Sequence, residues 1–144
     1  MGSEYSAVIT DASCFIILDK ISALHILDNL FSKVITTPEI ALEYGKKLPH
    51  WVSVQSVQNK DLQNQFENIV DEGEASAIAL AAEVNCDYLL TDDRAARRLA
   101  EQKGIIVKGS AGVLLFAKQK GIISLLRPYL EQIQQTNFRI SQQT

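Results

Sequence analysis

The sequence predicts an α/β fold, a three-layer α/β/α sandwich around a central and mainly parallel sheet. Short apolar segments rich in β-branched residues alternate along the chain with longer segments of helical periodicity. Glycines follow two of the helical segments, at Gly104 and Gly121, where they are typical helix stops. Strands that alternate with helices form βαβ units with right-handed crossovers, so the strands are expected to run parallel.

The first elements follow from local patterns. Residues 6–11 (SAVITD) are apolar and β-rich, which predicts a strand that ends at Asp11. Residues 21–31 carry leucine, isoleucine and phenylalanine at helical spacing. Residues 33–37 (KVITT) form a short β-rich run, and the segment PEIALEYGKK opens with proline, which is favoured at a first helical position. Residues 51–57 (WVSVQSV) alternate as a half-buried or edge strand does.

The middle of the chain repeats the strand–helix pattern. Residues 71–84 form a strong alanine-rich helical segment, and residues 86–91 (CDYLLT) are expected to form the next strand. Residues 93–104 predict a helix that ends at its glycine. Residues 105–109 (IIVKG) predict another strand.

The last elements are expected to be two helices and a short strand. Residues 110–121 read as a helix with a second glycine stop. Residues from about 124 to 135 are amphipathic and predict a final helix, and residues 138–140 (FRI) predict a short terminal strand.

Size and composition predict one globular domain over residues 1–144. The chain is long enough for one ordinary core, and its 47% apolar and 22% charged residues fit neither a disordered nor a fibrous protein. No apolar run approaches a membrane span, and the amino terminus lacks the features of a secretory signal. Cys14 and Cys86 lie far apart without metal-type spacing, which favours free thiols and a cytoplasmic location.

The net charge of −3 is unevenly distributed along the chain. Residues 1–93 carry 15 Asp/Glu and 5 Lys/Arg, whereas residues 94–144 carry 2 Asp/Glu and 9 Lys/Arg. An acidic region beside a basic one suits a metal site that also binds a polyanion. The division also fits a surface without such a site, because halves of a sequence need not be halves of the folded molecule.

Four acidic residues are candidates for one site at the carboxyl edge of the sheet, where open α/β sheets bind ligands. Asp11 and Asp93 follow predicted strands, Glu43 lies on the helix after the second strand, and Glu74 lies in the first turn of the alanine-rich helix. Converging carboxylates repel one another unless protons or cations are present. Mg²⁺ prefers such oxygen ligands, lowers the pKa of bound water and stabilises charge during attack at phosphorus.

Each acid also has a purely structural interpretation. Asp11 can end a strand through an Asx turn, and Glu43 can be a solvated helix residue. Glu74 stands three residues after Asp71, which is the spacing of a capping box. Any residue of the Thr91–Asp93 stretch can cap the helix that follows. Capping does not explain, however, why the acids gather at one predicted edge.

Three arginines follow these acids on one helical face. Either Arg97 and Arg98 pair with Glu101, which contributes only tenths of a kcal/mol, or the arginines contact the phosphates of a nucleic acid beside the metal site. The sequence leaves these two interpretations open. The residues concerned are Arg94, Arg97 and Arg98.

Together these motifs resemble the PIN-domain family of Mg²⁺/Mn²⁺-dependent ribonucleases, which includes the VapC-like toxins of type II toxin–antitoxin pairs. The resembling segments are VITDAS, TTPEIALEY and GEASAIALAAEVNCDYLLTDD, and the resemblance covers about residues 7–141. The later segments GSAGVLLFAKQKGII and NFRIS are similar to a bacterial or archaeal PIN subfamily rather than to the best-known toxins.

The resemblance implies roles for individual residues and partners. It implies that Mg²⁺ or Mn²⁺ is held by the four acids and that RNA is cleaved by a metal-activated water. It also implies a homodimer and a small antitoxin that blocks the site, whereas the lack of an apolar run of membrane-spanning length predicts no membrane association. By the same match Ser13 and Thr91 are supporting hydroxyls. Asp92 departs from the family pattern as an additional carboxylate that is either a helix cap or an outer contributor.

The chain also departs from the toxin pattern after the fourth acid, and two other functions stay open. Ala96 stands where toxins usually carry phenylalanine three residues after the fourth acid. One rival is a catalytically silent binding protein with the PIN fold. The other is a Mg²⁺-binding phosphoacceptor receiver domain, although receivers place their acidic pair after the first strand, where this chain has one aspartate.

Overall fold

A single five-stranded sheet forms the centre of the protein, and each neighbouring pair of its strands is parallel. The structure, a computed structural model, describes residues 6–136. The strands are β1 (Ala7–Thr10), β2 (Lys33–Thr36), β3 (Val52–Val54), β4 (Tyr88–Leu90) and β5 (Val107–Lys108). Their order is β3-β2-β1-β4-β5, so the chain builds outward from β1 in one direction and then crosses to the other side of it.

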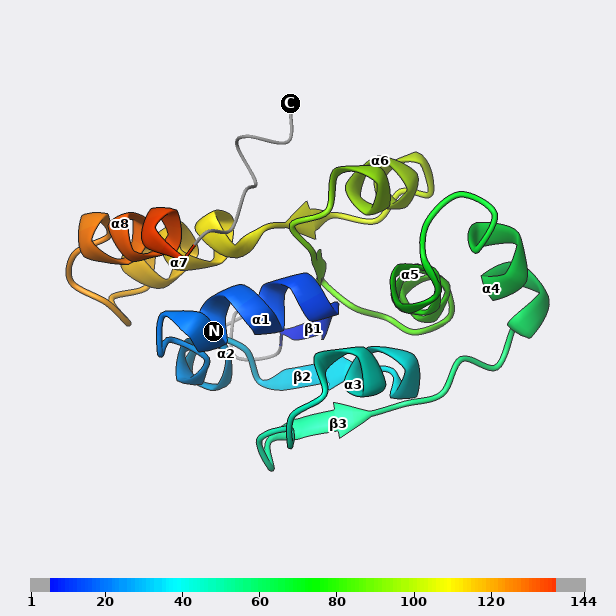
Figure 1. Ribbon diagram of the computed structural model, residues 1–144, viewed down its shortest axis with the longest axis horizontal. Helices are drawn as coiled ribbons and strands as arrows, with labels where there is room; N and C mark the ends of the chain where they lie inside the picture. Colours follow the sequence, from blue (N-terminus) through cyan, green and yellow to red (C-terminus); the bar gives the residue numbers. More distant parts are fainter. Residues whose placement is uncertain (1–5, 137–144) are drawn as a thin grey trace.

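Within the described residues eight helices surround this sheet (Figure 1). They are α1 (Ala12–Lys20), α2 (His25–Leu30), α3 (Pro38–Tyr44), α4 (Lys60–Phe66), α5 (Glu72–Glu83), α6 (Arg94–Gln102), α7 (Ser110–Gln119) and α8 (Arg127–Gln135). Helix α7 contacts α1 and α2 on the left of the view, whereas α4, α5 and α6 group on the right. Helix α3 contacts both α1 and α5 and so joins the two groups.

The central strands are apolar because both of their faces are covered. Val8, Ile9, Val34 and Ile35 are each at most 3% exposed, as expected for strands between two helical layers. Strand β3 lies at the edge and is mostly exposed. The alternating pattern of residues 51–57 therefore correctly predicted an edge strand, although the strand is shorter than expected.

Helix α5 is buried on nearly all sides, and most of its buried residues are small. It contacts β1, β4, α3, α4 and α6, and its stretch from Ala75 to Ala81 is buried throughout. Alanine side chains permit this close approach and favour the helical conformation. The amino end of α5 is thereby held against the sheet and α3, which matters for the site described below.

The predicted three-layer α/β/α class is confirmed, with two helices that the sequence pattern did not predict. Helix α1 is an almost continuous apolar run, and such runs do not distinguish a buried helix from a strand by periodicity. Helix α4 is mostly polar and buries only Gln63 and Phe66, so its helical period is weak. The predicted strand at 138–140 lies outside the described residues.

The structure also describes the two cysteines and the lengths of the helices. Cys14 is buried, Cys86 is half-buried, and both thiols are free, as predicted. Across residues 6–136, every helix is too short or too polar to cross a membrane.

Candidate functional site at the carboxyl edge of the sheet

The strand order reverses between β1 and β4, and two of the candidate acids follow these two strands. Thr10 pairs with Leu90 in the register of the sheet, and the backbone N–H of Asp11 donates to the Leu90 carbonyl at 3.0 Å. Asp93 comes three residues after Leu90 and begins α6. Parallel α/β sheets bind ligands at such a reversal, outside the carboxyl ends of the strands.

Asp11 is buried at this point, with only 2% of its surface exposed, and it caps α1. Its Oδ1 accepts hydrogen bonds from the Ser13 N–H at 2.9 Å and from the Ser13 hydroxyl at 2.7 Å. Its Oδ2 accepts one from the Thr91 hydroxyl. Burial raises the pKa of Asp11 to about 7, although the hydrogen bonds from Thr91 and Ser13 act in the opposite direction. The carboxylate is therefore held in one orientation.

The two hydroxyls that were predicted as supporting residues tie the ends of β1 and β4 together. Thr91 Oγ1 accepts a hydrogen bond from the Asp93 N–H at 3.1 Å while it donates to Asp11. Ser13 Oγ donates to Asp11 and accepts from the Asp92 N–H at 3.0 Å. Each hydroxyl thus connects Asp11 to the backbone of the acidic pair.

Glu74 and Asp93 both act as caps and also lie close to each other. Asp93 Oδ2 accepts from the Ala96 N–H at 2.9 Å, and Glu74 forms a complete capping box with Asp71. Burial raises the pKa of Glu74 to about 8, with further contributions from the charges of Asp93, Asp71 and Asp11. The capping interpretation is therefore correct for both residues, and it coexists with mutual repulsion among the acids.

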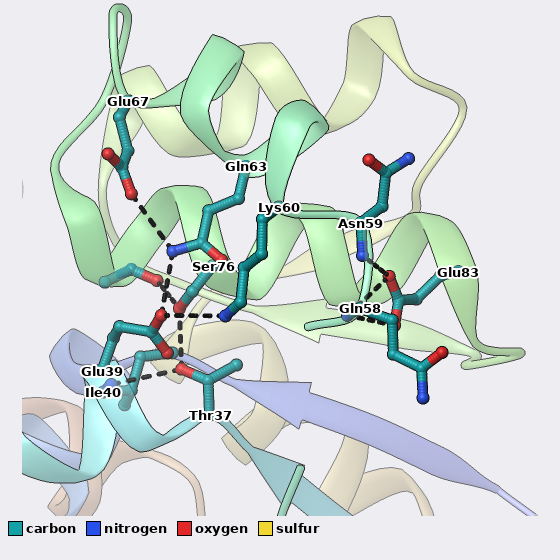
Figure 2. A network of polar contacts seen from close by, with 11 residues as sticks. Thr37, Glu39, Ile40, Gln58, Asn59, Lys60, Gln63, Glu67, Ser76 and Glu83 are labelled. Carbon is teal, nitrogen blue, oxygen red and sulfur yellow. Dashed lines mark hydrogen bonds and ion pairs between the residues drawn. The ribbon is translucent and has the colours of Figure 1, made fainter. Parts of the chain in front are cut away.

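A buried hydroxyl pair joins the start of α3 to the first turns of α5 (Figure 2). The hydroxyls of Thr37 and Ser76 lie 2.7 Å apart, and Ser76 Oγ also donates to the Gly73 carbonyl at 2.7 Å. Thr37 caps α3, where its Oγ1 accepts from the Ile40 N–H at 3.2 Å. The pair therefore sets the position of α3 relative to the first turn of α5.

Glu43, on the last turn of α3, extends toward that first turn. A Cβ atom added to Gly73 would collide with Glu43 Oε1, so glycine leaves the space that this carboxylate occupies. Burial raises the pKa of Glu43, and the charge of Asp71 adds to the effect. Asp11, Glu74 and Asp93 thus lie together, whereas Glu43 lies at the margin of the cluster beside Asp71.

The acids fit Mg²⁺ or Mn²⁺ by the type of their ligand atoms but do not form a closed set of metal ligands. Within residues 6–136 no three Asp, Glu, His or Cys side chains are arranged to hold one metal ion. The cause is local, since Asp93 and Glu74 are each turned toward a backbone N–H of a helix start. All the donors are carboxylate oxygens, which these cations prefer.

Within residues 6–136 the cluster also has no ion-pair partner. The ion pairs in the described part of the chain are Lys46–Asp19 and Lys60–Glu39, and neither includes an acid of the cluster. Buried carboxylates without a counter-charge have raised pKa values, as Asp11 and Glu74 do. A divalent cation would supply the missing charge.

The additional carboxylate, Asp92, points away from this cluster toward α7. Its two oxygens accept from the Ser110 N–H at 2.8 Å and from the Ser110 hydroxyl at 2.5 Å. Burial raises the pKa of Asp92, whereas the bonds from Ser110 and the charge of Arg97 oppose the shift. Asp92 therefore caps the start of α7 rather than that of α6.

The three arginines do not share one environment. Arg94 and Arg97 line a cleft of about 590 Å³ between α6 and the start of α7, and Arg98 is not among the residues of its wall. Neither Arg97 nor Arg98 forms an ion pair with Glu101 in the part of the chain that the structure describes. The pairing interpretation of the arginines is therefore not realised in this structure.

The sequence patterns did not identify four residues of the site, namely Thr37, Gly73, Ser76 and Ser110. Gly73 and Ser76 flank a candidate acid, but their roles depend on α3, whose approach to α5 has no sequence signal. Ser110 follows β5 at the same edge of the sheet as Asp11. Applying the rule for strand ends to β5 would have identified it.

Comparison with known proteins identifies the family. A family model described as a PIN domain matches residues 7–144. No curated protein matches the chain. PIN domains are generally nucleases that use divalent metals. The match excludes the receiver-like alternative and spans nearly the whole chain, and the protein therefore belongs to the PIN-domain family.

Proposed function

We propose that this protein is a Mg²⁺/Mn²⁺-dependent endoribonuclease that hydrolyses RNA phosphodiester bonds. The observation that carries the proposal is the meeting of Asp11, Glu74 and Asp93 at the reversal of strand order, with no ion-pair partner in the described part of the chain. A cluster of this kind is costly to keep in the folded protein. Binding of a divalent cation would offset that cost.

Asp11, Glu43, Glu74 and Asp93 would hold the cation. A bound Mg²⁺ or Mn²⁺ lowers the pKa of a coordinated water and stabilises charge on the leaving oxygen. Asp11 is already oriented by its hydrogen bonds. Glu74 and Asp93 would turn from their capping N–H groups, and such bonds at helix starts contribute only about 1 kcal/mol.

Ser13 and Thr91 would act as positioning residues. Their hydroxyls hold the Asp11 carboxylate and the backbone of the acidic pair at the same time. Partners that orient metal ligands typically contribute 10- to 100-fold in affinity or activity. We further propose that Arg94, Arg97 and Arg98 contact phosphates of the RNA strand.

We extend the proposal to a toxin of a type II pair, active as a homodimer and inhibited by a small antitoxin. The support is the resemblance of the acidic motifs to those of VapC-like toxins. A short neighbouring reading frame with a DNA-binding pattern would be expected for such a pair. Its product should co-purify with this protein and suppress RNA cleavage.

The direct test is the substitution Asp11→Asn, assayed for cleavage of single-stranded RNA with Mg²⁺, with Mn²⁺ and with EDTA. Asparagine keeps the shape and the Oδ1 acceptor, so the variant is expected to fold. We expect activity in the wild type only with the cations, and at least about 100-fold less in the variant, because loss of a supporting residue alone costs 10- to 100-fold. Unchanged cleavage would overturn the assignment. A wild type that cleaves no RNA and binds no Mn²⁺ in calorimetry would support the catalytically silent alternative.

A further inference from the structure

The cleft between α6 and α7 lies directly beside the acid cluster. Asp93, which begins α6, belongs to both the cluster and the wall of the cleft. The opposite wall is formed by the first turn of α7, including Ala111 and Gly112. A ligand in the cleft would therefore lie next to a cation held by the acids, which makes the occupant of the cleft relevant to the proposed reaction.

The charged groups of this wall favour an anion. Arg94 and Arg97 line the cleft, and neither forms an ion pair in the described residues. The carboxylates of Asp92 and Asp93 also belong to the wall, but each accepts hydrogen bonds from a helix start. Lys108 contributes its aliphatic stem, because its ammonium lies over the rings of Tyr88 and Phe116 at 4.7 and 5.0 Å.

The first turn of α7 adds unpaired backbone donors to the arginines. Asp92 accepts from the Ser110 N–H, whereas the N–H groups of Ala111 and Gly112 have no acceptor within the described residues. Unpaired amides at a helix start attract anions, and phosphate is a frequent ligand of such positions. Gly112 also leaves this wall without a side chain.

A second glycine brings Arg97 close to Asp92. A Cβ atom on Gly109 would lie 2.7 Å from Asp92 Oδ1 and 3.4 Å from Arg97 Nη2, so a side chain there would displace the Asp92 carboxylate and contact the guanidinium. The guanidinium is thereby held near the start of α7 while its charge acts on Asp92. Arginine forms strong bonds with phosphate oxygens, because its donors match their geometry.

We propose that this cleft binds one backbone phosphate of the RNA strand, adjacent to the phosphate that is cleaved, through Arg94, Arg97 and the free amides at the start of α7. The proposal rests on the proposed ribonuclease function for the identity of the strand. It assigns no role to Arg98, which lies outside the cleft. In this arrangement Asp92 is a positioning residue for Arg97 and α7 rather than a metal ligand.

The test measures RNA binding without cleavage. A fluorescent single-stranded RNA is titrated with the metal-free protein in EDTA, and its dissociation constant is followed between 0.05 and about 0.3 M salt. Loss of one phosphate contact reduces the magnitude of the salt slope for a single strand by about 0.7, so the dissociation constant changes about fivefold less over one decade of salt. We expect this full reduction for the double variant Arg94→Gln/Arg97→Gln and a part of it for each single variant, because both arginines contact the same phosphate.

Gly112 offers a matched pair of variants that differ only in charge. An aspartate in the first turn of α7 suits the helix dipole, so Gly112→Asp is expected to fold, but its carboxylate would repel the phosphate. Gly112→Asn has the same size without the charge. We expect Gly112→Asp to bind RNA at least fivefold more weakly than Gly112→Asn, whereas Lys118→Gln, at the far end of α7, should bind as the wild type does.

A strand with one uncharged methylphosphonate linkage identifies the phosphate. If the linkage beside the scissile position occupies the cleft, neutralising it should weaken wild-type binding about fivefold and should weaken binding by the double variant Arg94→Gln/Arg97→Gln much less. Equal binding by Gly112→Asp and Gly112→Asn, or an unchanged salt slope in both arginine variants, would overturn the cleft assignment. Charge-dependent binding without any cleavage in Mg²⁺ would leave the cleft in place and overturn the ribonuclease proposal instead.

Discussion

Two groups of carboxylates differ in what neutralises them. At the edge of the sheet, Asp11, Glu74 and Asp93 have hydroxyl and backbone donors but no ion-pair partner among residues 6–136. Under α4, by contrast, the carboxylates of Glu39 and Glu67 are bridged by one buried amide. Acidic residues in proximity therefore do not by themselves indicate a site.

The second group has its own donors (Figure 2). Gln63 Nε2 donates to Glu39 at 2.9 Å and to Glu67 at 3.1 Å, and the Lys60 ammonium lies 3.8 Å from Glu39. Among the described residues, one oxygen of Glu39 and the amide oxygen of Gln63 are buried without a donor. This group connects α3 to α4, whereas the first group gathers charge that no cation within residues 6–136 balances.

The largest expected difference between the two groups concerns catalysis. Glutamine is also a capping-box residue, so Glu74→Gln should keep the start of α5 intact. We expect it to lower Mg²⁺-dependent RNA cleavage at least about 100-fold, because a ligand charge is lost, whereas Glu39→Gln should change it less than about twofold. Rates of cleavage under single-turnover conditions provide the measurement, and circular dichroism verifies the fold of both variants.

If both substitutions lowered the rate equally, the comparison between the two groups would fail. The cluster of Asp11, Glu74 and Asp93 would then have no special role in catalysis, and the raised pKa values of Asp11 and Glu74 would reflect burial alone. If neither lowered it, the metal-ligand assignment of Glu74 would be wrong.

The cluster of Asp11, Glu74 and Asp93 at the edge of the sheet (the edge cluster) could be predicted from the sequence, because Asp11 and Asp93 follow the ends of strands. Once residues 6–11 and 86–91 are recognised as parallel strands, Asp11 and Asp93 must follow them at the same edge. The alanine-rich segment likewise predicted a buried helix with Glu74 in its first turn. These inferences use local patterns and one general rule of parallel sheets.

The surroundings of Glu43 and Asp92 could not be predicted from the sequence. They depend on how helices pack against one another, and local sequence patterns do not encode that packing. The contact between α3 and α5 brings Glu43 to Gly73, and the bond from Asp92 to Ser110 spans 18 residues. The sequence pattern does not reveal that the side chains of Asp92 and Asp93 point to different helices. In the structure one points to α7 and the other to α6, because consecutive side chains after a strand leave in different directions.

A smaller effect is expected from the hydroxyl that joins the ends of β1 and β4. Thr91→Val removes the donor to Asp11 and the acceptor for the Asp93 N–H. We expect cleavage to fall about 10- to 100-fold and the free energy of unfolding to fall by about 1–3 kcal/mol. Thr36→Val is the matched control, since the buried Thr36 hydroxyl donates to the Thr10 carbonyl at 2.8 Å and contacts no acid.

Thr36→Val should therefore lose comparable stability in urea denaturation while it keeps most of its activity. Equal losses of activity in the two variants would mean that Thr91 matters only for folding. Retention of activity in Thr91→Ser would support the positioning role, because serine restores both hydrogen bonds.

The smallest expected effect is a change in thermal stability with pH and cation. The folded-state pKa values of Asp11 and Glu74, about 7 and about 8, lie above their ordinary values of 3.8 and 4.5. Between about pH 4 and pH 8 the folded protein thus binds more protons than the unfolded chain, so these two residues make stability fall as the pH rises. Without divalent cations the melting temperature should decrease across this window, and Glu74→Gln should flatten the decrease while Glu39→Gln should not.

Mn²⁺ competes with the same protons, so it should raise the melting temperature by a few degrees at pH 8 and by less at pH 5. A ligand at 100 times its dissociation constant stabilises by about 2.7 kcal/mol, which sets the upper scale of this shift. Differential scanning fluorimetry with Mn²⁺ and with EDTA at both pH values measures it. An equal shift at pH 5 and pH 8, or one that persists in Asp11→Asn, would place the bound cation elsewhere. The edge cluster would then be no more a cation site than the carboxylates under α4.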